Sequence, residues 1–185
     1  ILSTNVTYGG TGSGTVNLRG ALTGQGGLTK NGSSILVVWS NDFSLPNTYS
    51  GGSIVNGGTF EFNNLGGQKW FVGGGTGPIT VNGGTFAIRN LRAINDNPIV
   101  FNGGGWSIGN SAVSTWSGPV TLNANITINF VSSSANLTLN NTISGAGGVS
   151  LISTVGPVAG KLTLLATNTY TGPTTIGTNC VLNCE

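Results

Sequence analysis

The chain has 185 residues but only 6 Lys and Arg, 4 Asp and Glu and no His, for a net charge of +2. An ordinary domain is about 25% charged and this one is 5%, so we expect no basic surface for nucleic acid. Because 37% of the residues are hydrophobic, the chain is not a disordered linker. No run approaches the roughly 20 apolar residues of a membrane span, and residues 1–185 are expected to form one domain.

Short strands are expected from the first residues onward. Residues 1–8 read as a strand, and the longest apolar run, 35–39, reads as another. The segment 15–60 contains Gly-Gln-Gly-Gly at 24–27 and Asn-Thr-Tyr-Ser-Gly at 47–51, which are typical of turns and corners. Apolar residues do not follow a helical period, and good helix formers are scarce, so no helix is expected.

The middle of the chain repeats a short motif. A strand that begins with proline and ends with asparagine occurs at 78–82, 98–102 and 119–123, so that its spacing is nearly constant. A second short strand follows each copy, at 85–88, 105–108 and 126–130, and Asn-Gly-Gly begins at 56, 82 and 102. Within each strand, apolar and polar residues alternate, as they do in a half-buried strand.

A second copy of the first motifs spans residues 136–178. It repeats the segment 15–60 at one constant offset, as from Gly24 to Gly145 and from Asn47 to Asn168, without a gap. This offset is about six of the short steps.

A step of about 20 residues is what one coil of a three-sided β-helix requires. Each coil then places like residues over like residues, with strands about 4.8 Å apart, whereas an antiparallel sandwich gives no reason for this recurrence. We therefore predict an all-β fold: a single right-handed parallel β-helix, or β-solenoid, of about nine coils. Asn82 should lie over Asn102 in an asparagine ladder, with Val, Ile, Leu and Phe inside and Thr and Ser outside.

The duplicated motifs resemble the autotransporter-associated β-strand repeat. The residues that carry the likeness are 24–30, 47–51 and 56–60 in the first copy and 168–175 in the second. The resemblance implies a parallel β-helix in large secreted or surface-exposed bacterial proteins, and it implies no catalytic residues.

Candidate catalytic residues are few. The acids are Asp42, Glu61, Asp96 and Glu185, and the separation of Glu61 from Asp96 is not an obvious multiple of a coil. We expect them to be solvated, and we predict no enzyme activity, no cofactor and no metal site. The tryptophans at 39, 70, 106 and 116 and the tyrosines at 8, 49 and 170 either fill the core or form a strip that stacks on glycans; Tyr49 and Tyr170 should pack at equivalent corners.

The two cysteines, Cys180 and Cys184, are four residues apart. In an extended strand their Cα atoms would be about 13 Å apart, too far for a disulfide. Three alternatives remain open: a local disulfide across a turn, disulfides to other subunits, and free thiols.

The ends of a solenoid present unpaired strand edges. Residues 1–8 and 174–182 read as strands without a helical cap, and the apolar residues expected at these ends are Ile1, Leu2, Val6, Tyr8, Ile176, Val181 and Leu182. Head-to-tail stacking of copies would give a filament. Because the sequence has no starting Met and no signal-peptide pattern, the chain is predicted to be a processed product or fragment. The scarcity of charge favours an extracellular or cell-surface location. The chain would act as a self-associating structural subunit or, alternatively, as the rod of a glycan-binding adhesin.

Overall fold

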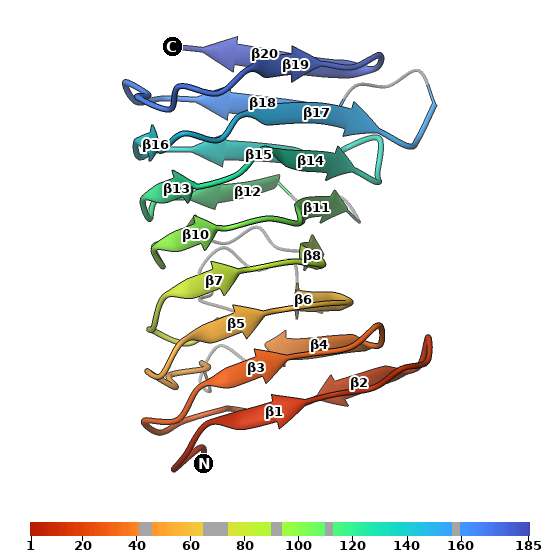
Figure 1. Cartoon of the computed structure of the whole chain (residues 1–185), viewed down its shortest axis with the longest axis vertical. Coiled ribbons are helices and arrows are strands. Elements are labelled where there is room, and N and C mark those ends of the chain that lie inside the picture. The colour runs from red at the N-terminus through yellow and green to blue at the C-terminus, as the bar shows by residue number, and fades with distance from the viewer. Residues whose placement is uncertain (41–45, 65–73, 90–93, 110–112, 157–159) are drawn as a thin grey trace.

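The computed structural model describes residues 1–40, 46–64, 74–89, 94–109, 113–156 and 160–185. Within these ranges the chain forms twenty strands and no helix, and the strand pairs are parallel. Figure 1 shows the strands stacked along one axis, with the two chain termini at opposite ends. The prediction of a parallel β-solenoid is confirmed.

The strands form three sheets, one on each side of the coil. Sheet A contains β1 (Val6–Tyr8), β3 (Leu28–Lys30), β5 (Ser53–Val55), β7 (Ile79–Val81), β10 (Ile99–Phe101), β13 (Val120–Leu122) and β16 (Ile143–Ser144). Sheet B contains β2 (Thr15–Leu18), β4 (Ile35–Ser40), β6 (Thr59–Asn64), β8 (Thr85–Arg89), β11 (Gly105–Gly109), β14 (Ile126–Phe130), β17 (Val149–Ser153) and β19 (Thr174–Ile176). Sheet C contains β9 (Ile94–Asn95), β12 (Val113–Trp116), β15 (Asn136–Leu139), β18 (Gly160–Leu164) and β20 (Cys180–Cys184).

Apolar ladders fill the interior. In sheet B, one inward row contains residues that pair in register and are all buried: Leu36, Phe60, Phe86, Trp106, Ile128 and Leu151. At mid-height this row meets aromatic residues of the other two sheets. Trp106 and Trp116 pack edge to face with ring centroids 5.3 Å apart, and Phe86 and Trp116 do so at 5.9 Å. Fully burying a large apolar side chain contributes roughly 1.5–3 kcal/mol, so these ladders are the main source of stability.

An asparagine ladder runs along the corner between sheets A and B, as predicted. Each amide donates from Nδ2 to Oδ1 of the asparagine one turn closer to the N-terminus, over 2.7–2.8 Å. Asn82 lies over Asn102 in this series. We define the asparagine ladder as Asn31, Asn56, Asn82, Asn102 and Asn123.

The solenoid has about seven turns, so the predicted number of nine was too high. The asparagine ladder shows why. Its partners are separated by 20 and 21 in the sequence only from Asn82 to Asn102 and from Asn102 to Asn123. In the preceding turns the separations are 25 and 26. The proline-asparagine motif, from which the number of residues per turn was predicted, lies in the shortest turns. The predicted turn was therefore too short, and the predicted number of turns too high.

The offset between the two repeat copies is also not six turns. Leu28 lies in sheet A, whereas its counterpart Val149 lies in sheet B; likewise Ser53 lies in sheet A and Thr174 in sheet B. The second copy therefore begins five turns and one side further along the stack. The motif can occur on a different side of the coil because its hydrogen bonds extend only to the adjacent turn, and the three sides have similar strands.

The charged side chain of Lys30 points into the coil. Lys30 is fully buried at the end of β3, and its ammonium donates hydrogen bonds to the carbonyls of Asn31, Gly32 and Gly57. Burial lowers the pKa of Lys30. The counterpart of Lys30 in the second copy is Leu151, which is also buried. The inward position therefore accepts an apolar residue, and the charge is not a requirement of the repeat.

The two repeat copies make the same local hydrogen bonds. The Leu22 amide donates to Asn47 Oδ1 over 2.8 Å, and the Ile143 amide donates to Asn168 Oδ1 over the same distance. The hydroxyl of Tyr49 lies 2.8 Å from Ser53 Oγ, and in the second copy the equivalent distance, from Tyr170 to Thr174 Oγ1, is 2.6 Å. The two tyrosines thus occupy equivalent positions in their motifs, although on successive sides of the coil.

Because Tyr49 is buried, the free energy of unfolding should decrease at alkaline pH. Its ring is fully buried, and desolvation raises the pKa of Tyr49 far above its usual value, although the hydrogen bond to Ser53 lowers it somewhat. As the pH rises through about 10, the unfolded chain loses the phenol proton and the folded chain keeps it. The free energy of unfolding should therefore fall, by up to about 1.4 kcal/mol per pH unit.

Urea unfolding of the wild type and of Tyr49→Phe at pH 8 and above pH 10 measures this effect. The variant should lose the part of the alkaline fall that Tyr49 causes, whereas the matched control Tyr170→Phe should keep it because Tyr49 is unchanged. The lowered pKa of Lys30 adds an opposite slope below about pH 10.5, which is common to all three proteins and cancels in the comparison. An unchanged pH dependence in Tyr49→Phe would contradict the assignment.

Candidate functional site

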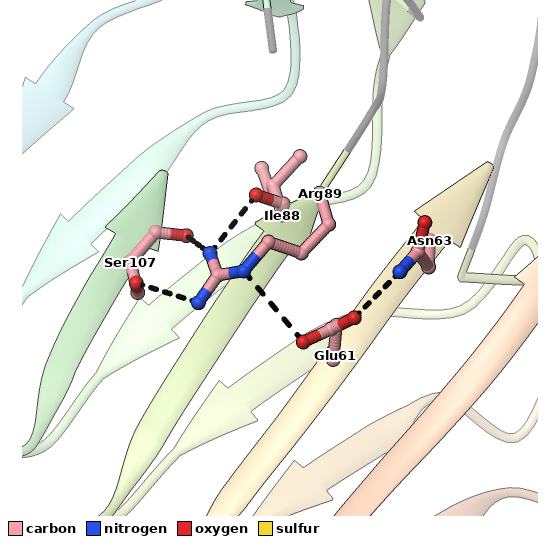
Figure 2. A network of polar contacts seen from close by, with 5 residues as sticks. All are labelled: Glu61, Asn63, Ile88, Arg89 and Ser107. Carbon is pink, nitrogen blue, oxygen red and sulfur yellow. Dashed lines mark hydrogen bonds and ion pairs between the residues drawn. The ribbon is translucent and has the colours of Figure 1, made fainter. Parts of the chain in front are cut away.

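Polar side chains gather on the outer face of sheet B, over β6, β8 and β11. Because Phe60 and Phe62 point inward, Glu61 and Asn63 point outward, and the register places Asn63 beside Arg89. Figure 2 shows that Glu61, Asn63, Arg89 and Ser107 form one connected network. We call these four residues the Glu61–Arg89 cluster.

The cluster is held by an ion pair and charge-assisted hydrogen bonds. Arg89 Nε lies 3.7 Å from Glu61 Oε2, and Asn63 Nδ2 donates to Glu61 Oε1 over 2.7 Å. The other side of the guanidinium faces β11: Nη2 donates to Ser107 Oγ over 3.0 Å and Nη1 to the Ser107 carbonyl over 3.2 Å. Desolvation lowers the pKa of Arg89, and the charge of Glu61 opposes that shift. The two charges cancel, so the cluster is polar but neutral.

A depression of about 360 Å³ lies beside the cluster. It is open because outward positions on β11 carry small residues, Gly105 and Ser107. A Cβ atom at Gly105 would lie 3.0 Å from the Thr127 carbonyl oxygen, so the strand approaches its neighbour closely there. The lining residues are Thr59, Thr85, Arg89, Gly105, Trp106, Ser107, Thr127, Asn129 and Ile152.

The depression offers hydrogen-bond donors and acceptors together with threonine methyl groups. Asn129 Oδ1 is buried and has no hydrogen-bond partner among the described residues. Amide and hydroxyl groups, together with a guanidinium whose charge Glu61 balances, suit hydrogen bonds to the hydroxyl groups of an uncharged ligand. Glu61 faces a cation, whereas Asp96 lies on an exposed corner after β9 in sheet C, so the structure does not bring these two acids together.

The acids occupy three kinds of position. Glu61 was expected to be solvated, but its side chain is only 15% exposed because Arg89 and Asn63 cover it. Asp96 and Glu185 are exposed, and Asp42 lies outside the described residues.

The sequence does contain a signal for the cluster. The Asn-Gly-Gly motifs that begin at Asn56 and Asn82 differ in position by 26, and the two asparagines lie one above the other. The same step, applied to the strands that follow these motifs, places Asn63 over Arg89, as the structure does. A prediction that uses a uniform turn of about 20 residues does not find this pairing.

The tryptophans divide between core and surface. Trp106 and Trp116 are 1% and 0% exposed and belong to the interior, so they do not form an outer strip. Trp39 lies on the outer face of β4, where the Arg19 guanidinium carbon is 4.8 Å from its ring centroid and Nε1 donates to Asn17 Oδ1 over 2.7 Å. Trp39 stands one strand below Asn63 in register. Trp70 lies outside the described residues.

The apolar residues predicted for the ends lie on terminal strands or beside them. Val6 and Tyr8 are partly buried in β1, the first strand of sheet A, and Ile1 is exposed while Leu2 is buried. At the other end, Ile176 lies in β19, the last strand of sheet B, and Val181 and Leu182 lie in β20, the last strand of sheet C. Ile176 is 51% and Val181 39% exposed.

The cysteines occupy the two ends of β20. Both are free thiols, Cys180 partly buried and Cys184 exposed, and burial raises the pKa of Cys180. They pair in register with Gly160 and Leu164 of β18. Along a strand, residues i and i+4 are on the same side and about 13 Å apart, so in this conformation neither thiol reaches the other.

In the described part of the chain, no three or more His, Cys, Asp or Glu residues come together in a group that could hold a metal ion. Among the same residues, no helix has the length and apolar character needed to cross a membrane.

Two segments of the chain match a family model, that of the passenger-associated-transport-repeat: residues 28–61 and 159–178. Comparisons with curated proteins and with solved structures gave no match. The first segment runs from β3 into β6 and the second includes β18, and both contain the Asn-Thr-Tyr motif whose hydrogen bonds are duplicated. These two matches confirm the predicted resemblance: the segments are similar to the passenger-associated-transport-repeat, the autotransporter-associated repeat that the motifs indicated.

Proposed function

We propose that this chain is a non-catalytic, stiff structural element of an extracellular bacterial fibre or surface assembly, extended by stacking of further β-solenoid turns on its two ends. The observation that carries the proposal is the continuity of the parallel ladders. The eight strands of sheet B pair one above the next from β2 to β19. Such a stack resists bending because every turn is tied to the next by backbone hydrogen bonds on its sides.

The terminal turns offer surfaces on which stacking can continue. β19 and β20 carry exposed apolar side chains, Ile176 and Val181, and β2 carries Val16, which is 44% exposed. A strand edge with apolar residues and no charge favours pairing with another strand. A second copy of this chain can supply the next turn, by end-to-end stacking or strand exchange; in a longer passenger, the same polypeptide can supply it.

Electron microscopy of the purified chain over a range of concentrations tests self-association. The expected result is rods whose lengths grow with concentration. Ile176→Lys should shorten them, because a lysine on the edge strand opposes pairing. The matched control is Val113→Lys, an equally exposed apolar position on β12 inside the stack, which should leave the lengths unchanged. Particles of one length at every concentration would count against end-to-end assembly.

A second candidate function is favoured by the outer face of sheet B. Trp39, Asn63 and Arg89 lie on successive strands in register, next to the depression that contains Asn129. An aromatic ring beside a charge-balanced cluster of polar groups is suited to binding a glycan. In this alternative, the chain is the rod of a secreted adhesin, and sheet B contacts glycans on another surface.

A glycan array separates the two functions. Binding that is lost in both Trp39→Ala and Asn129→Ala, and kept in the control Val113→Ala, would support the adhesin. Binding that survives both substitutions, or no binding by the wild type, would contradict a glycan site on this face.

A further inference from the structure

The asparagine ladder contains an unusual density of chemically sensitive sequences. Four of its five members, Asn31, Asn56, Asn82 and Asn102, are each followed by glycine. Asparagine before glycine deamidates most readily, because glycine has no side chain to obstruct the approach of its backbone nitrogen. Asn56, Asn82 and Asn102 are exposed to water, so hydrolysis is not prevented by burial.

The reaction requires the side chain to move. The glycine nitrogen attacks Cγ of the asparagine, and a C–N bond forms as ammonia leaves. Water then opens the resulting succinimide at one of its two carbonyl groups, giving aspartate or isoaspartate. The overall change is the gain of one water and the loss of one ammonia, with no oxidant or reductant.

The fold holds the interior members of the ladder away from this reaction. Asn56, Asn82 and Asn102 each use Nδ2 as a donor to the asparagine below and Oδ1 as an acceptor from the asparagine above. Their backbone amides are also held, over 2.8 Å, by carbonyls of the preceding turn. Turning Cγ toward the glycine nitrogen would break both side-chain bonds, a penalty that corresponds to about a tenfold or greater loss of rate.

We propose that the asparagine ladder is a set of deamidation sites that the folded solenoid protects, and that this protection is directional. Asn31 is the ladder member nearest the N-terminus. Its backbone amide donates to the Tyr8 carbonyl, but among the described residues its side chain has one hydrogen bond, which Oδ1 accepts from Asn56. It should therefore react first among the four Asn–Gly sites. Each reaction replaces an amide donor by a carboxylate, which can accept a hydrogen bond but cannot donate one.

The direction follows from the orientation of the amides. If Asn82 becomes aspartate, Asn56 loses the donor that held its Oδ1 and faces a negative charge instead. Asn102 keeps its bond, because its Nδ2 still finds a carboxylate oxygen at position 82. Deamidation of one asparagine should thus make its N-terminal ladder neighbour more reactive, whereas its C-terminal neighbour keeps the hydrogen bond that protects it. Successive deamidations would therefore proceed along the asparagine ladder toward the first turn.

Peptide mapping by mass spectrometry, on the whole chain aged at mildly alkaline pH, tests the proposal. In the wild type, the three interior sites should deamidate at least about tenfold more slowly folded than in urea, with Asn31 the fastest of the folded sites. Asn82→Asp should accelerate Asn56 several-fold and leave Asn102 at the wild-type rate. Asn82→Ala, which removes both donor and acceptor, should accelerate both neighbours.

Three results would overturn the inference. Equal rates in folded and unfolded chains would mean that the ladder gives no protection. Acceleration of Asn102 rather than Asn56 in Asn82→Asp would reverse the direction. Equal acceleration of all sites in both variants, with the folded state shown to be intact by circular dichroism, would mean that the protection does not pass from one amide to the next.

Discussion

Replacing Trp116 by alanine is expected to lower the free energy of unfolding by about 3–5 kcal/mol. Trp116 is fully buried where the three sheets meet, its ring packs edge to face on Trp106 and Phe86, and Nε1 donates to the Asn97 carbonyl over 3.0 Å. The substitution leaves a cavity among aromatic rings and deprives that carbonyl of its donor. Chemical denaturation followed by circular dichroism measures the change.

The control for this prediction is the preceding residue on the same strand. Thr115 points outward from β12, so Thr115→Ala should change the free energy of unfolding by no more than about 0.5 kcal/mol. If the two variants were equally stable, the aromatic residues at mid-height would not be the centre of the core. The comparison also separates the interior from the outer face of sheet C, because the strand and its backbone hydrogen bonds are the same in both proteins.

Replacing Gly145 by alanine should destabilise the chain by about 2 kcal/mol or more. Gly145 has a φ of +110°, which side chains disfavour, and a Cβ atom there would lie 2.1 Å from the Leu122 carbonyl oxygen. Its counterpart Gly24 has a φ of +114° and the same close approach, at 2.3 Å, to the Leu2 carbonyl oxygen. Backbone atoms cannot yield as a flexible side chain would, so the turns must separate at that corner.

Denaturation of Gly145→Ala and Gly24→Ala, with Gly14→Ala as the control, measures the effect. Gly14 has open space at its Cβ position and no positive φ, so alanine should be tolerated there. Both motif variants should be destabilised although the two glycines precede strands of different sheets. A large loss in Gly14→Ala, or none in Gly145→Ala, would show that the close approach of successive turns at the motif is not what selects glycine.

The parallel stacking could be predicted from the sequence because it leaves a local signature. The strands at 78–82, 98–102 and 119–123 each begin with proline, end with asparagine and carry apolar residues at their second and fourth positions, and each pairs with the next in register. Alternation of apolar and polar residues then identifies the inward rows without knowledge of the rest of the fold. The asparagine ladder could be predicted for the same reason, since identical amides at a constant place in the turn meet one another.

The number of turns and the polar cluster could not be predicted in the same way. The sequence separation of ladder asparagines in successive turns varies from 20 to 26, because residues at a corner can project outward without disturbing the ladders. A prediction that assumes the same number of residues in every turn therefore places Glu61 incorrectly relative to Arg89. Lys30 was missed for a different reason: its side chain alternates inward like an apolar residue, and the carbonyls that receive its ammonium belong to the corner and the adjacent turn.

By itself, the sequence determined that this protein is an all-β, parallel, stacked chain with an apolar interior and an amide ladder, because each of these properties depends on contacts between like residues in neighbouring turns. Only the tertiary structure decided how many turns there are, that the second repeat begins on a different side of the coil, and that Glu61, Asn63, Arg89 and Ser107 meet on sheet B. These three properties depend on how many residues each corner contains, and neither the hydrogen bonds between turns nor the packing of the core fixes that number.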